Sequence, residues 1–121
     1  MGRLQWKRVY DPVEDVDGTR MLIDRLWPRG LKKELAQIDE WPKEISPTTE
    51  LRRSYHRGEI DFQAFSKAYQ MELEENSGVL EFISMLRNGL ENGNITLVYG
   101  SKNPDQSHVI VLQRYLEEHL K

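Results

Sequence analysis

The C-terminal third of the chain, residues 79–120, reads VLEFISMLRNGLENGNITLVYGSKNPDQSHVIVLQRYLEEHL. Its first part places apolar residues at helical spacing, at Val79, Ile83, Leu86 and Leu90. A short apolar run follows at residues 95–99 and is typical of a buried strand. The helical spacing then returns at Val109, Leu112, Leu116 and Leu120. This order of helix, strand and helix favours an α/β fold.

Two further strands are predicted near the N-terminus, over residues 4–10 and 19–26. The second has a continuous apolar centre at residues 21–23, which is typical of a strand covered on both faces. Only about eight residues separate the two strands. Because that is short for a helical crossover, the sequence leaves the direction of their pairing open.

Helices are predicted between the second and third strands. One begins after a cap at either Ser46 or Thr48 and ends near Gly58. Residues 61–75 form another, with one apolar face made of Phe62, Phe65, Tyr69 and Leu73. The last helix is expected to begin at Pro104, capped by Asn103. We therefore expect a single domain over residues 1–121: a small, mostly parallel sheet with helices packed on it.

The composition excludes several classes of protein. Cysteine is absent, so a disulfide framework, a thiolate zinc site and a cysteine nucleophile are excluded. No apolar run approaches the roughly 20 residues that a membrane span needs. The N-terminus is polar and predicts no signal peptide. We expect a cytoplasmic protein without membrane contact.

The charge is acidic overall but unevenly spread. The net charge is −3, yet residues 1–57 hold 12 Lys and Arg against 10 Asp and Glu. Such a balance makes nucleic-acid binding unlikely but is compatible with a local site for a small anion. The chain has three scattered histidines, His56, His108 and His119, and they do not indicate a metal site. No glycine pattern indicates a nucleotide cofactor. We expect neither a metal nor a cofactor.

Two loops are expected to meet at one edge of the sheet, because ligands of open parallel sheets bind beyond the carboxyl ends of strands. Residues 24–30 leave the second strand, and residues 99–103 leave the third. The candidate anion-binding residues are Arg25, Arg29, Gly100, Ser101 and Lys102. The alternative is structural, since arginines often hold loops in place through backbone carbonyls.

His108 is the candidate general acid or base at this edge, with Tyr99 positioning it. A hydrogen-bonded, half-buried structural histidine is an equal alternative. Asp24 and Trp27 are expected to order the site rather than to react. His56 is read mainly as a cation at a helix end, favourable against the helix dipole.

Residues 23–31, Ile-Asp-Arg-Leu-Trp-Pro-Arg-Gly-Leu, resemble the YeaO-like branch of the DUF488 family of bacterial proteins. Further matching segments are residues 9–12, 46–52 and 96–102, in the family's order. The resemblance spans nearly the whole chain and implies one DUF488-like domain: a small cytoplasmic α/β protein from a family without an established activity.

The broader family often carries a Cys-His-Arg segment at the start of its last helix, resembling an anion-gripping or redox site. The corresponding residues here are Ser107, His108 and Val109, so only the histidine is retained. The resemblance therefore implies no thiol chemistry for this chain, and it draws attention to His108 without assigning a reaction.

Two functions from different classes follow. The first is binding of, or action on, a small phosphorylated or carboxylated ligand at the strand edge. The second is a non-catalytic protein-interaction module, for which a homodimer is one option. Its signature would be an exposed apolar patch and no enclosed pocket near Arg25. Whether the chain is an enzyme stays open at this point.

Overall fold

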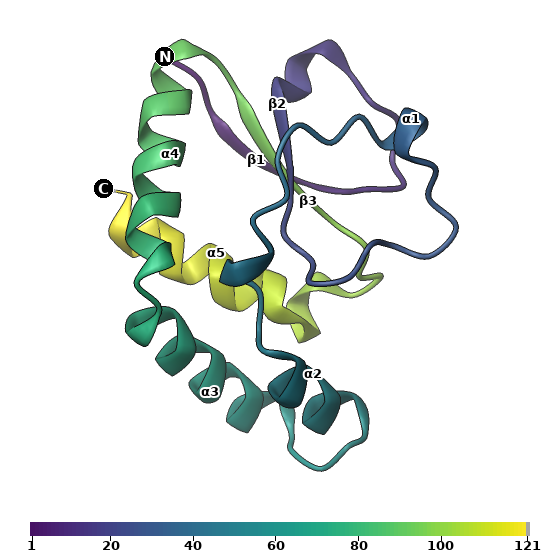
Figure 1. The fold of residues 1–121 in the computed structure, drawn as a ribbon, viewed down its shortest axis with the longest axis vertical. Coiled ribbons are helices and arrows are strands. Elements are labelled where there is room, and N and C mark those ends of the chain that lie inside the picture. Colours follow the sequence, from purple (N-terminus) through teal and green to yellow (C-terminus); the bar gives the residue numbers. More distant parts are fainter. Residues whose placement is uncertain (121) are drawn as a thin grey trace.

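A computed structural model describes residues 1–120 of the chain. Three strands form its sheet: β1 (Leu4–Arg8), β2 (Thr19–Leu22) and β3 (Ile95–Tyr99). The five α-helices of the described residues are α1 (Lys33–Ala36), α2 (Thr49–His56), α3 (Phe62–Glu75), α4 (Gly78–Asn92) and α5 (His108–His119). These elements confirm the predicted α/β class (Figure 1).

The strand order is β1-β3-β2, and both outer strands run parallel to β3. The two N-terminal strands therefore do not pair with each other; the last strand lies between them. A link of ten residues, which includes the 3₁₀ turn Asp15–Asp17, returns the chain from the end of β1 to the start of β2. Both strands are shorter than predicted, since the chain turns away after Arg8 and after Leu22.

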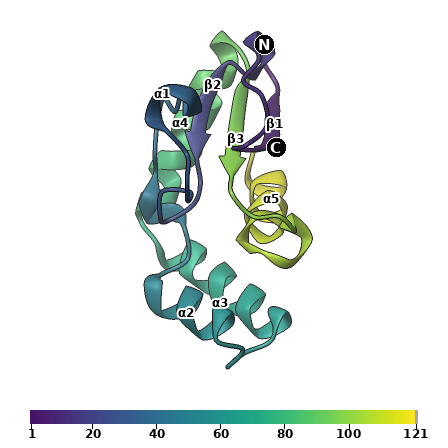
Figure 2. The same cartoon turned by 90° about the vertical axis from the view of Figure 1, so that its right-hand side faces the viewer.

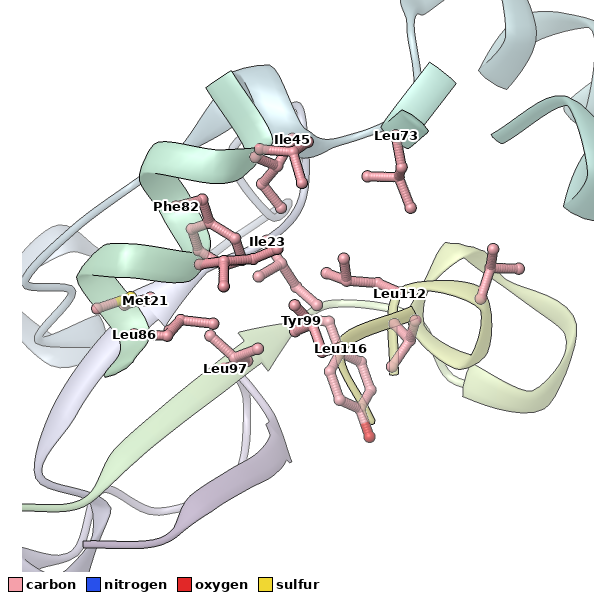
Figure 3. Packing of buried hydrophobic residues seen from close by; sticks show 14 of the residues in the cluster. Met21, Ile23, Ile45, Leu73, Phe82, Leu86, Leu97, Tyr99, Leu112 and Leu116 are labelled. Atoms are coloured by element: carbon pink, nitrogen blue, oxygen red, sulfur yellow. The ribbon is translucent and has the colours of Figure 1, made fainter. Parts of the chain in front are cut away.

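The two faces of the sheet have different cover. Ile95, Leu97 and Tyr99 face a large core built with α3, α4 and α5 (Figure 3). Leu22 and Val98 face the other side, where residues 27–41 cover them. This alternation follows from the two-residue period of a strand. Buried on both faces, β3 is apolar throughout except for Thr96.

The helix starts decide one open choice and correct one prediction. Thr48 caps α2, accepting a hydrogen bond from the amide of Leu51, while Ser46 is buried and donates to the carbonyl of Ile23. Residues 104–106 form a separate 3₁₀ turn, so α5 begins at His108 with Ser107 as its cap. His108 is therefore the first residue of this helix. All peptide bonds of the described residues are trans, including Trp27-Pro28 and Trp41-Pro42.

The helices α2 and α3 lie beyond the carboxyl ends of the strands (Figures 1 and 2). Tyr55 of α2 joins them to the 3₁₀ turn before α5, because its hydroxyl donates to the carbonyl of Gln106 at 2.7 Å. The fold thus places a helical wall opposite the loops that leave β2 and β3. Among residues 1–120, none of the helices combines the length and apolar character that crossing a bilayer requires.

Candidate functional site

A cavity of about 380 Å³ lies at the carboxyl edge of the sheet. It is lined by the loops after β1, β2 and β3, by α2 and the segment that enters it, by Phe65 of α3, and by residues 106–108 at the start of α5. Its polar and charged lining includes Asp24, Arg25, Arg29, Arg52, His56, Ser101, Gln106, Ser107 and His108. The sequence rule that placed a site beyond the strand ends therefore coincides with a real hollow in the molecule.

Asp24 ties the two loops together. Its Oδ2 accepts a hydrogen bond from the amide of Gly100 at 2.9 Å, and its own carbonyl accepts one from the indole of Trp41. A Cβ atom at Gly100 would approach that Oδ2 to 3.1 Å, so the close contact favours glycine there. The amide of Gly100 is thus directed at Asp24.

His108 lies against the same carboxylate. Its Nε2 is 3.0 Å from the carbonyl oxygen of Ile23 and 3.2 Å from Oδ1 of Asp24. Because both neighbours are acceptors, Nε2 carries a hydrogen, and Nδ1 is the ring nitrogen left to exchange a proton. The side chains of His108 and Asp24 are only 15% and 19% exposed, so this pair is largely shielded from water.

Arg25 is held by backbone carbonyls, as the structural alternative anticipated. Its Nε donates to the carbonyl of Pro47 at 2.7 Å and its Nη2 to that of Ser46 at 3.0 Å. These bonds fix the loop after β2 to the segment that enters α2. The guanidinium still lines the cavity and brings its positive charge there.

Arg52 was not singled out by sequence reasoning, yet it lines the cavity. Its Nε is buried and has no hydrogen-bond partner among residues 1–120. A buried donor without a partner is costly, and few remain in folded proteins. His56 follows four residues later, and the two share one face of α2. The spacing of Arg52 and His56 predicts that they share a helix face. Nothing in the sequence predicts that α2 lies at this edge of the sheet.

The other predicted residues divide into two groups. Arg29, Gly100, Ser101 and Trp27 all line the cavity. Lys102 and Tyr99 are not in its lining. Lys102 is exposed to solvent, because Arg8 and Asp24 hold the preceding residues and turn the loop outward.

Tyr99 points into the core with Leu97 (Figure 3). Burial and the nearby Asp11 raise the pKa of its hydroxyl above the ordinary value, and Arg8 opposes this only in part. The structure thus does not bring Tyr99 to the cavity beside His108. The two-residue alternation along β3 could have predicted this burial, since Tyr99 shares the face of Ile95 and Leu97.

The charge of the lining is positive although the whole chain is acidic. Three arginines meet a single carboxylate, that of Asp24, which gives a balance of +2 with the histidines neutral. In the described part of the chain, no cluster of His, Asp or Glu is arranged to hold a metal ion. The arrangement suits a small anion: guanidinium groups match the geometry of phosphate and carboxylate oxygens.

Comparison with known proteins agrees with the family resemblance. Residues 3–121 match the family model described as "Inactive DUF488-N3 subclade". The chain is 43% identical over 113 residues to the uncharacterised protein YeaO of Escherichia coli K12, which covers 93% of this chain and 96% of that protein.

It is also 33% identical over 114 residues to the uncharacterised protein Mb3100c of Mycobacterium bovis, covering 94% of this chain and 93% of that one. No solved structure matches. Together, the family model and these near-full-length relatives show that the chain belongs to the DUF488 family, in its YeaO-like branch.

Proposed function

We propose that the cavity at the carboxyl edge of the sheet binds a small anionic ligand, phosphorylated or carboxylated. The observation that carries the proposal is Arg52, whose buried Nε lacks a partner at the wall of a cavity rich in arginine. The guanidinium that carries this donor belongs to a half-buried side chain in the cavity lining, and an anion in the cavity would neutralise its charge. Arg29 and Arg25 would add positive charge, and Ser101 a hydroxyl.

His108 has a defined part in this proposal. Because its Nε2 hydrogen is directed at the carbonyl of Ile23, with Oδ1 of Asp24 3.2 Å away, its Nδ1 is the atom that would donate to, or accept from, a bound ligand. The description of the matching family model as inactive, together with the absence of cysteine, supports binding without turnover as the simpler form of the proposal. A catalytic role for His108 is its second form, supported by the shielded pair with Asp24.

The protein-interaction alternative has weaker support. Its signature was the lack of a pocket near Arg25, whereas Arg25 lines a cavity of about 380 Å³. Large exposed apolar side chains of the described residues include Leu35, Met71 and Leu80, which lie on three different helices. We therefore prefer anion binding to a docking role.

An amide NMR titration with inorganic phosphate at two salt concentrations tests the proposal. We expect saturable shifts in four segments at once: residues 24–29, 52–56, 100–101 and 106–108. The shifts should persist at the higher salt concentration, because a partly enclosed site is screened less than surface charge. Scattered shifts that vanish with salt would reject the proposal, and so would shifts confined to Lys102 and its neighbours.

A further inference from the structure

The cavity has an aromatic wall beside its arginines. Tyr10, Trp27, Tyr55 and Phe65 all contribute to the lining, together with the apolar side chain of Leu26. Arg52 and Tyr55 are three residues apart on α2 and therefore neighbours on one face of the helix. An anion held by Arg52 would have the ring of Tyr55 within reach.

Contacts within the protein hold two of these rings in place. Tyr55 stacks on Phe65 with ring centroids 4.5 Å apart, and its hydroxyl is bound to Gln106. The indole of Trp27 donates to the carbonyl of Leu31 and packs edge-on against Trp41. Rings that are fixed before binding lose little conformational entropy when a ligand packs on them.

The mouth of the cavity exposes apolar surface. Tyr10 is 44% exposed and Leu26 is 57% exposed, and both line the cavity. The hydroxyl of Tyr10 donates to the carbonyl of Arg29, which fixes this rim beside a cation. A ligand with an apolar part would remove this surface from water, which an inorganic anion cannot do.

The volume of the cavity and the charge of its lining narrow the class of ligand further. About 380 Å³ greatly exceeds the ~30 Å³ that one water occupies, and it lies at the small end of the range for organic ligands. The lining balance of +2 matches the charge of a phosphate monoester, roughly −1.5 to −2 at neutral pH, better than that of a single carboxylate.

We infer that the ligand is a phosphate monoester that also bears a flat ring, with the phosphate at Arg52 and the ring against Tyr55 and Trp27. This inference rests on the proposed anion site and adds the ligand class. A nucleoside monophosphate and a simple aryl phosphate share this chemistry.

Isothermal titration of the full chain with four probes tests the inference: inorganic phosphate, glycerol phosphate, phenyl phosphate and uridine monophosphate. We expect the two ring-bearing probes to bind about tenfold more tightly than glycerol phosphate, in keeping with the usual strength of ring stacking. Tighter binding of uridine monophosphate than of phenyl phosphate would assign the ring to a nucleoside. Tighter binding of phenyl phosphate would assign it to an aryl group, and both results support the inference.

The matched variants are Tyr55→Leu and Tyr55→Phe. The first should reduce the preference for ring-bearing probes to about threefold or less, and the second should retain it. Equal binding of phenyl phosphate and glycerol phosphate by the unmodified protein would overturn the inference while leaving the anion site intact. Failure of all four probes to bind would reject the proposed function itself. Because the unmodified protein decides both, poor folding of Tyr55→Leu would not protect the inference.

Discussion

Two clusters of oppositely charged side chains lie at the two ends of the sheet, and they differ in how completely their donors are paired. The Asp17 cluster, made of Lys7, Glu14, Asp17 and Arg20, lies near the start of β2. The cavity cluster, made of Asp24, Arg52 and His108, lies near its end. Asp17 accepts from both Lys7 and Arg20, at 3.1 and 2.7 Å. Arg52 has a buried Nε with no partner in residues 1–120.

The two arginines of these clusters have different partners. Arg20 is 2% exposed, and its Nη1 and Nε bind Asp17 and the carbonyl of Ala36, leaving only Nη2 without a partner. Its charge is neutralised inside the protein, next to the hydroxyl of Thr96 that fixes the carbonyl of Asp17. Arg52 has no carboxylate to neutralise it and borders a cavity. A buried arginine paired with a carboxylate indicates a structural role, whereas a half-buried arginine without a carboxylate, beside a cavity, indicates a ligand.

The largest expected effect is on stability, at Arg20. Replacement Arg20→Met leaves the buried Asp17 with Lys7 as its remaining cationic partner, so we expect a loss of about 3 kcal/mol in the free energy of unfolding. Urea unfolding measures this loss. Phosphate affinity should stay within about twofold of the original. A loss below about 1 kcal/mol would show that the Asp17 cluster is not the structural element described here.

Asp24→Ala should cost about 2 kcal/mol, because it leaves the half-buried amide of Gly100 without its acceptor. It should also weaken phosphate binding, since the loops after β2 and β3 would no longer be tied. Thermal unfolding and titration of the same sample measure both. A variant with normal stability and normal affinity would remove Asp24 from the site-ordering role.

Acid should destabilise the fold through Asp17. Burial alone raises the pKa of this carboxyl, but hydrogen bonds from the Glu14 amide, Lys7 and Arg20 outweigh it, so the pKa lies below its ordinary value of 3.8. The ionised Asp17 carboxylate and its partners therefore contribute their full stability at pH values above the ordinary pKa. This stability is lost as the pH falls through the lower pKa of the folded protein.

We expect the stability gap between the unmodified protein and Asp17→Asn to be full above about pH 5 and to narrow below about pH 4. Unfolding free energies across this range test the expectation. A gap that widens on acidification would contradict the sign of the shift.

The smallest effects compare two cations of the sequence-predicted site. Arg29 lines the cavity and Lys102 does not. We expect Arg29→Ala to weaken phosphate binding about threefold, typical of a partly exposed charge, and Lys102→Ala to leave it unchanged. Equal losses from both variants would mean that general surface charge, rather than the cavity, attracts the anion.

Much of this arrangement could be predicted from the sequence, because it depends on local pattern. The apolar run of residues 95–99 and the helical stripes around it fixed the class of fold. The strand-end rule predicted that residues 24–30 and 99–103 meet, and of the second loop Gly100 and Ser101 line the cavity. Arg52 could not be found in this way, since its position depends on how α2 packs. That packing rests on contacts distant in sequence, from Arg25 to Pro47 and from Tyr55 to Gln106.

The central claim is that Arg52 anchors a small anion, and its neighbour Arg53 provides a matched control. Arg53 is exposed on the same helix and is not in the cavity lining. Isothermal titration with inorganic phosphate should show Arg52→Gln binding about tenfold more weakly than the unmodified protein, because charge-assisted hydrogen bonds to phosphate are lost. Arg53→Gln should stay within about twofold. Equal affinities for the two variants would contradict the account.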